Sequence, residues 1–142
     1  MLNNLVVAIS GGVGLLGSAF SRTVVTNGGR VIIGDIKKKP GDHLVAELGE
    51  DRATFFQGDL TNVSVIDQFI QKGKEQFGRV DAAVHCAYPV SEQWGSRFED
   101  LQPAELEKDL FLQLGGSILF SQRMIRHFRG QGYGNLVHIS SI

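Results

Sequence analysis

Short apolar runs rich in β-branched residues alternate with longer amphipathic segments along the whole chain. Apolar runs that stop at glycine or polar residues are typical of strands buried on both faces, and the segments between them have helical apolar spacing. The predicted strands are residues 5–9, 30–34, 53–57, 80–87 and 135–140, and the predicted helices are residues 15–26, 42–48, 63–77 and 103 to about 128. Parallel neighbours need crossover connections, so this alternation predicts an α/β fold with a doubly wound parallel sheet. A length of 142 residues suits one such domain.

A glycine-rich turn joins the first predicted strand to the first predicted helix. It is part of an unusual composition, because the chain has 18 glycines, nearly twice the usual share of about 7%. The turn reads Ser-Gly-Gly-Val-Gly-Leu-Leu-Gly over residues 10–17. Such a turn lets the backbone approach a pyrophosphate, which then lies at the helix N-terminus where free N–H groups favour an anion. The turn therefore predicts a dinucleotide site.

Asp35 ends the second predicted strand, 24 residues after Gly11. A carboxylate at this place binds the hydroxyls of an adenosine ribose and repels a 2′-phosphate, which favours NAD over NADP. Residues 37–39 are three lysines, which would neutralise a 2′-phosphate if they faced it. We interpret the lysines as a solvated turn, so NAD is the expected cofactor and NADP the alternative.

Other phosphate-binding motifs fit the turn less well. Gly12 and Gly17 have the spacing of a P-loop, but Ser18 and Ala19 stand where that loop needs lysine and serine or threonine. A methyltransferase of similar architecture usually has an acidic residue before its glycines, whereas this chain has Ser10. The remaining alternative is that the glycines serve only close packing of the helix on the sheet.

The order of these motifs resembles the short-chain dehydrogenases/reductases over essentially the whole chain. Gly-Asp-Leu-Thr at residues 58–61 is similar to the step that this family sets against adenine, and residues 134–141 are similar to the strand that delivers its catalytic serine. Ala-Tyr-Pro at residues 87–89 resembles a variant found in flagellin-modification and sugar-biosynthesis oxidoreductases. The resemblance implies a Rossmann-type fold with strand order 3-2-1-4-5. The cofactor-binding residues that it implies are Ser10, Gly11, Gly14, Leu15, Leu16, Gly17, Asp35, Ile36, Asp59, Leu60, Cys86, Ala87 and Tyr88.

The same resemblance implies two catalytic residues. Ser141 aligns with the serine that orients the carbonyl or hydroxyl of the substrate, and Gln113 stands where the family has an asparagine of a proton relay. The family's Tyr-x-x-x-Lys follows its serine by about a dozen residues, and in this chain neither Tyr88 nor Tyr133 has a lysine four residues on. We therefore expect residues 1–142 to form a single dinucleotide-binding domain without its carboxyl-terminal part and later strands, inactive alone.

Two functions remain open from the sequence. The first is an NAD-dependent oxidoreductase that transfers hydride between nicotinamide and an alcohol or carbonyl substrate, active at full length. The second is a non-catalytic dinucleotide-binding sensor or scaffold module. An intact Tyr-x-x-x-Lys in the continuing reading frame would decide for the enzyme.

Charge and composition restrict the partners. Fourteen Lys and Arg against 15 Asp and Glu give a net charge of -1, so we expect no nucleic acid partner. No apolar run reaches the roughly 18 residues of a membrane span, and the lone Cys86 agrees with a cytoplasmic, reducing location. The histidines lack paired metal spacing, so we expect no metal site.

The helix predicted from residue 103 has two further features. Acidic residues gather at its start, and we interpret them as a solvated face: Glu99, Asp100, Glu105, Glu107 and Asp109. It also has more apolar positions than one sheet-facing stripe requires: Leu106, Leu110, Leu114, Leu119, Met124, Ile125 and Phe128. The excess predicts a homodimer or homotetramer for the full-length protein.

Overall fold

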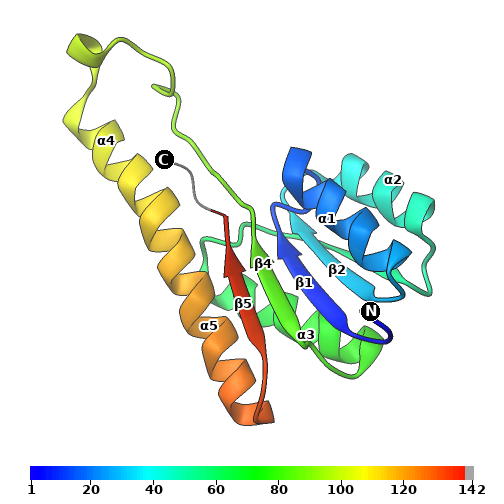
Figure 1. Ribbon diagram of the computed structural model, residues 1–142. Helices are drawn as coiled ribbons and strands as arrows, with labels where there is room; N and C mark the ends of the chain where they lie inside the picture. Colours follow the sequence, from blue (N-terminus) through cyan, green and yellow to red (C-terminus); the bar gives the residue numbers. More distant parts are fainter. Residues whose placement is uncertain (140–142) are drawn as a thin grey trace.

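The fold is known from a computed structural model that describes residues 1–139. Its centre is a five-stranded parallel sheet in the order β3-β2-β1-β4-β5 (Figure 1), which is the order that the family resemblance implies. The strands are β1 (Val6–Ser10), β2 (Arg30–Asp35), β3 (Ala53–Gln57), β4 (Ala82–His85) and β5 (Asn135–His138). The order reverses between β1 and β4, and in such sheets ligands bind beyond the carboxyl ends of the strands at that place.

Helices cover both faces of the sheet (Figure 1). Those that follow β1, β2 and β3 are α1 (Leu15–Thr26), α2 (Lys38–Leu48) and α3 (Val63–Phe77). Between β4 and β5 the chain forms a long loop with a 3-10 turn, η1 (Phe98–Asp100), then α4 (Pro103–Leu110), a π-helical stretch η2 (Phe111–Gly115) and α5 (Gly116–Gln131). Gly115 and Gly116 therefore do not divide the helix predicted from residue 103, because the chain passes through them in one helical course with a local change of hydrogen-bonding.

The core consists of two apolar layers, one on each side of the sheet. On one side Val24 of α1 and Leu44 of α2 pack against residues such as Ile9. On the other side Phe69 of α3 and Phe120 of α5, both fully buried, pack against residues such as Ala8. All five residues of β1 are buried, because it is a central strand with helices on both faces. Burying an aromatic side chain of this size contributes about 1.5–3 kcal/mol to folding.

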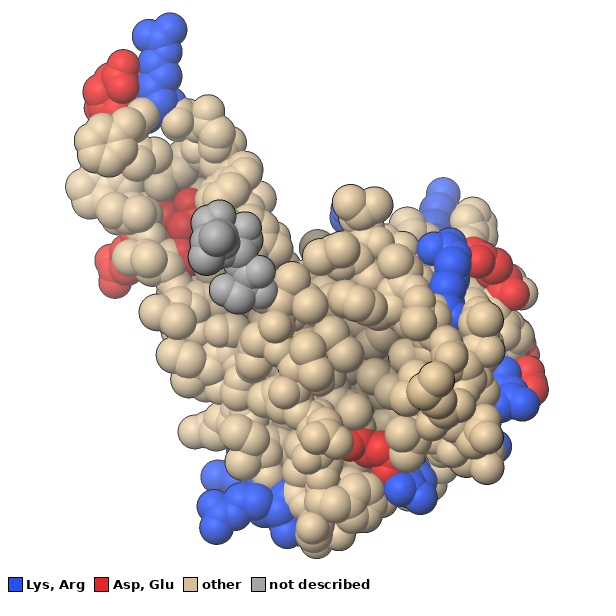
Figure 2. Space-filling model, in the orientation of Figure 1, with Lys and Arg blue, Asp and Glu red and all other residues tan. Residues whose placement is uncertain are grey.

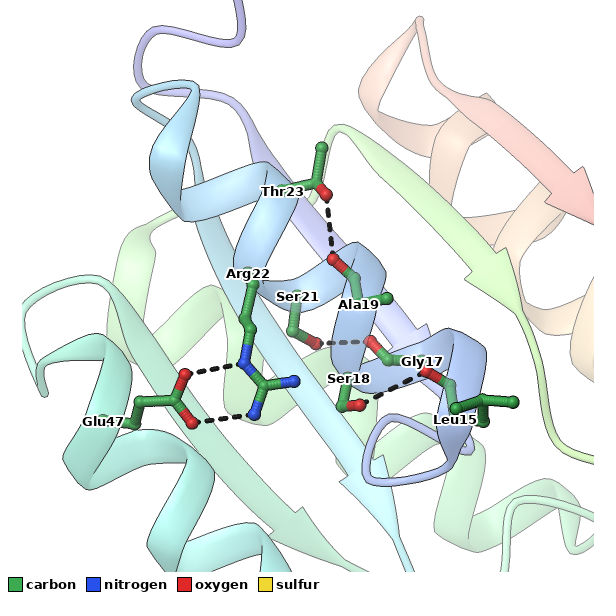
Figure 3. A network of polar contacts seen from close by, with 8 residues as sticks. All are labelled: Leu15, Gly17, Ser18, Ala19, Ser21, Arg22, Thr23 and Glu47. Atoms are coloured by element: carbon green, nitrogen blue, oxygen red, sulfur yellow. Dashed lines mark hydrogen bonds and ion pairs between the residues drawn. The ribbon is translucent and has the colours of Figure 1, made fainter.

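Helices α1 and α2 are also joined on the surface (Figure 3). The Arg22 guanidinium donates two hydrogen bonds to the Glu47 carboxylate, at 2.6 and 2.8 Å. These bonds hold the pKa of the Glu47 carboxyl below its usual value. Because both side chains are about half exposed, water screens the pair and it adds little to stability. The two helices are held on the sheet mainly by their apolar contacts.

Some predicted boundaries were wrong, for reasons that involve neighbours in space. Helix α2 begins at Lys38 instead of Asp42, so two of the three lysines lie in a helical turn, where Lys38 pairs with the Asp42 carboxylate at 2.7 Å. Strand β4 ends at His85, opposite Ser10, because β1 turns away there into its glycines. Cys86, predicted to lie in the strand, therefore follows it and is half-buried. The predicted continuation of the last strand to Ser140 lies outside the described residues.

Candidate functional site

A cleft of about 510 Å³ lies beyond the carboxyl ends of β1 to β4. That volume is in the usual range of small-molecule sites. Twelve of the residues predicted to bind a cofactor line it: Gly11, Gly14, Leu15, Leu16, Gly17, Asp35, Ile36, Asp59, Leu60, Cys86, Ala87 and Tyr88. The fold thus brings together four segments that are far apart in the sequence. Ser10, also predicted, does not line the cleft, as described below.

The glycine turn forms the middle of the cleft. Gly11 has a φ of 64°, and a Cβ there would lie 2.7 Å from the backbone of Ala87. Gly14 is the N-cap of α1 and makes no side-chain cap, and a Cβ there would meet only the Gly11 carbonyl oxygen, at 3.2 Å. The first N–H groups of a helix have no acceptor within the helix, so this end of α1 is suited to bind an anion. A backbone so close to the cleft is what a bound pyrophosphate requires.

Asp35 links the end of β2 to the glycine turn. Its Oδ2 accepts a hydrogen bond from the Val13 N–H at 3.3 Å, and its Oδ1 accepts one from the Lys37 N–H at 3.1 Å. Both bonds orient the carboxylate at the edge of the cleft. Lys37 also lines the cleft, whereas Lys38 is paired with Asp42. A carboxylate and one lysine therefore stand together at this edge of the cleft.

Beyond β3, a second carboxylate orders the other end of the cleft. Asp59 Oδ1 accepts hydrogen bonds from the Thr61 N–H at 3.0 Å and from the Thr61 hydroxyl at 2.8 Å. Leu60, between them, is buried but still lines the cleft. Gly58 and Thr61 line it as well and were not among the predicted residues. The sequence could have indicated both residues as cleft residues, because they flank Asp59 and Leu60 in the Gly-Asp-Leu-Thr segment.

Ser10 lies behind the cleft in a buried polar pair that the sequence analysis missed. Its side chain is fully buried, and its Oγ lies 2.7 Å from the Nδ1 of His85. Burial and the neighbouring His138 lower the pKa of His85 to about 4, so the imidazole is neutral at pH 7. Ser10 and His85 are register partners of β1 and β4, 75 residues apart. Only the pairing of those strands makes them neighbours.

The segment after β4 forms the far wall of the cleft. Burial raises the pKa of the Cys86 thiol to about 11, so Cys86 is a neutral small side chain and not a nucleophile at neutral pH. Tyr88 is largely exposed, and its ring packs edge-on against Trp94 with 5.3 Å between the centroids. Trp94 thus supports a residue of the cleft.

A second cavity of about 420 Å³ lies between this loop and α4, and Gln113, Trp94 and Asp109 are among the residues that line it. Gln113 belongs to η2, and its buried Nε2 has no hydrogen-bond partner within residues 1–139. The prediction that Asp109 belongs to a solvated face was wrong. Its side chain is only 9% exposed, because it accepts two hydrogen bonds from Ser91.

Three further predictions concern the catalytic serine, a metal site and a membrane span. Ser141 lies outside the described residues. Within the part of the chain that the structure covers, no three His, Cys, Asp or Glu side chains are grouped to hold a metal ion. Over the same part, no helix has the length and apolar character to cross a membrane.

Comparison with known proteins agrees with this geometry. The fold and the cleft define a Rossmann-type α/β protein, and the family model described as short chain dehydrogenase matches residues 5–142. The chain therefore belongs to the short-chain dehydrogenase family. Members of this family are oxidoreductases that use nicotinamide cofactors, act on small molecules and often form oligomers.

Individual relatives cover the whole chain. It is 30% identical to the post-translational flagellin modification protein A of Campylobacter coli, with 100% of this chain and 57% of the relative aligned. It is 27% identical to the 7alpha-hydroxysteroid dehydrogenase of Bacteroides fragilis, with 98% and 54% aligned. The chain thus spans about half the length of the curated relatives it matches.

Solved structures give the same fold. The crystal structure of gox2181 superposes with a TM-score of 0.86 at 27% identity, over 98% of this chain and 54% of that one. The 3-ketoacyl-(acyl-carrier-protein) reductase of Brucella melitensis, solved in complex with NADH, superposes with a TM-score of 0.85 at 22% identity, over 99% and 59%. At that identity the second likeness supports the fold alone.

Proposed function

We propose that the cleft binds NAD and that the chain is the cofactor-binding part of an oxidoreductase that interconverts an alcohol and a carbonyl. The observation that carries this proposal is one continuous cleft that joins a bare helix N-terminus to the Asp35 carboxylate. Membership of the short-chain dehydrogenase family favours an enzyme over a non-catalytic sensor or scaffold.

The order of the strands suggests how a dinucleotide lies. The sheet runs β3, β2, β1, β4, so the cleft runs from Asp59, past Asp35 and the glycine turn, to Tyr88. In this arrangement Asp59 and Leu60 bind the adenine end, and Asp35 accepts hydrogen bonds from ribose hydroxyls. The glycine turn and the first N–H groups of α1 bind the pyrophosphate. The nicotinamide end then lies against Ala87 and Tyr88.

When bound, NAD supplies a hydride acceptor and, reduced, a hydride donor. Two residues of this chain then act at the substrate oxygen, where a proton is gained or lost as the hydride is transferred. The free amide N–H of Gln113 is available to hold a water or a substrate oxygen, because it has no partner within residues 1–139. Ser141, by the family resemblance, orients the substrate oxygen. The general acid of the family is the tyrosine of Tyr-x-x-x-Lys, and a serine at neutral pH does not replace it.

A second copy of the chain is the proposed partner of an apolar helix face. Four of the predicted interface residues are exposed, namely Leu106, Leu110, Leu114 and Ile125, and Phe111 and Ile118 extend the same face. Met124 and Phe128, also predicted, are buried against the sheet and take no part. A mostly uncharged surface like the one in Figure 2 is compatible with self-association. We propose a dimer or tetramer formed through α4 and α5.

Titration of the chain with NADH, NADPH and ATP tests the proposed cofactor. We expect NADH to bind and to quench Trp94, the single tryptophan, which packs on Tyr88. Tighter binding of ATP than of NADH would contradict the proposal. Turnover is tested separately: residues 1–142 alone should oxidise no alcohol in the presence of NAD, and a protein that also contains Tyr-x-x-x-Lys should. Activity of the 142 residues alone would contradict the assigned roles.

A further inference from the structure

A buried aspartate of α4 holds the loop that follows β4. Asp109 Oδ1 accepts a hydrogen bond from the backbone N–H of Ser91 at 2.6 Å, and its Oδ2 accepts one from the Ser91 hydroxyl at 2.8 Å. Its neighbours Lys108 and Leu110 are exposed, whereas Asp109 and Ser91 are 9% and 6% exposed. A carboxylate is buried in this way only where its hydrogen bonds repay the loss of water.

The loop that Asp109 holds is the far wall of the cleft. Ser91 lies three residues after Tyr88, and its carbonyl oxygen accepts a hydrogen bond from the Trp94 N–H at 3.2 Å. Trp94 in turn packs edge-on against the Tyr88 ring. Ser91 is thus linked to Trp94 and Trp94 to Tyr88, and Asp109 attaches this series of contacts to the helix. An exposed tyrosine on an irregular loop has a defined position only through such an attachment.

Asp109 also lies one helical turn before Gln113. Residues four apart share a helix face, and both side chains line the second cavity together with Trp94. The same carboxylate therefore connects the wall of the first cleft to the helix that carries Gln113. By contrast, Asp35 and Asp59 at the other end of the cleft belong to β2 and to the segment after β3.

We propose that Asp109 is a positioning residue for the nicotinamide end of the cleft: by holding Ser91 it sets the place of Tyr88 and Trp94 without touching the cofactor. This inference rests on the proposed function, since it requires that the cleft binds NAD. The inference adds that a substitution can weaken binding at the nicotinamide end of the cleft without changing binding at the adenine end. Loss of Asp109 weakens the binding of NADH and leaves the binding of AMP unchanged, because AMP needs only the adenine end of the cleft.

The test uses calorimetric titration of NADH and of AMP into the wild-type chain and four variants. Asp109→Ala should raise the Kd of NADH by about tenfold and change that of AMP by less than about twofold. Asp109→Asn should restore most of the NADH affinity, because its amide oxygen accepts from the Ser91 N–H and its NH₂ group donates to the Ser91 hydroxyl. Ser91→Ala removes one of the two bonds and should raise the Kd of NADH by about threefold. Glu107→Ala, an exposed residue of the same helix, is the matched control and should behave as wild type.

Trp94 fluorescence gives a second readout without nucleotide. Release of the loop should move Trp94 emission toward that of a tryptophan in water in Asp109→Ala but not in Asp109→Asn. If Asp109→Ala does not fold, Ser91→Ala and Asp109→Asn decide, and the pattern expected for them supports the inference. An unchanged NADH affinity in Asp109→Ala or, where that variant does not fold, in Ser91→Ala would overturn the inference, and so would an equal loss of NADH and AMP affinity. A wild-type chain that binds neither nucleotide would overturn the proposed function and this inference together, whereas variants that all bind NADH like wild type would overturn the inference alone.

Discussion

Replacement of Gly14 and of Gly11 by alanine separates cofactor binding from folding. In Gly14→Ala the new Cβ would meet only the Gly11 carbonyl oxygen at 3.2 Å, in a backbone with φ -69° that any residue adopts. As an N-cap, alanine is less favourable than glycine and destabilises the folded protein by about 0.5–1 kcal/mol. Alanine also lowers the conformational entropy of the unfolded chain, which stabilises the folded protein by about 0.4–1 kcal/mol. The free energy of unfolding should therefore change by less than about 1 kcal/mol.

The same variant should bind NADH poorly. The side of Gly14 away from Gly11 is open to the cleft, so the new methyl group stands between the end of α1 and the pyrophosphate. We expect the Kd of NADH to rise at least about tenfold, which corresponds to about 1.4 kcal/mol. Calorimetric titration measures the affinity, and urea denaturation followed by far-UV circular dichroism measures the stability.

Gly11→Ala is the contrasting variant. Its φ of 64° costs a residue with a side chain about 1–2 kcal/mol, and the Cβ placed 2.7 Å from the Ala87 backbone adds an overpacking cost of about 1–3 kcal/mol. A loss of about 2–5 kcal/mol is a large part of the stability of a small domain. Gly11→Ala should therefore lose stability, and Gly14→Ala should lose binding alone. Wild-type NADH affinity in Gly14→Ala would refute the assignment of the turn to the pyrophosphate.

Three further predictions follow from the contacts of single residues. NADH should bind at least about tenfold more tightly than NADPH, and Asp35→Ser should reduce that preference. Equal affinities in the wild type would contradict the role of Asp35 and would indicate that Lys37 neutralises the 2′-phosphate of NADPH. Ile118→Glu with Ile125→Glu should convert a dimer or tetramer into monomers in sedimentation equilibrium, and an unchanged mass would exclude this helix face as the interface. The pKa of His85 is about 4 in the folded protein and about 6.5 in the unfolded chain. On acidification the imidazole is therefore protonated at a higher pH in the unfolded chain than in the folded protein. The free energy of unfolding should stay level above about pH 6.5 and fall toward pH 4 by up to about 3 kcal/mol, and His85→Gln should show a weaker fall.

Local patterns were enough to predict the alternating α/β architecture, the glycine turn and the place of Asp35, and the family resemblance supplied the other residues of the cleft. The strand-like runs and helical spacings depend on the two backbone periods, which are properties of a short stretch of chain. Because the ends of parallel strands meet at one edge, residues just after four predicted strands had to line one cleft. Gly11 and Asp35 were predicted from their places after strands, Asp59 and Tyr88 from the resemblance to the short-chain dehydrogenases/reductases, and all four line the cleft.

What the sequence patterns determined is therefore the class of fold and the glycine turn with Asp35, and the family resemblance added the strand order and the other segments of the cleft. What only the tertiary structure decided is which polar side chains face each other. Ser10 was expected at the cofactor but pairs with His85, and Asp109 was expected in water but binds Ser91, 18 residues away. The physical reason is that a polar side chain is buried only where a partner in space replaces its water, and no local period encodes that partner.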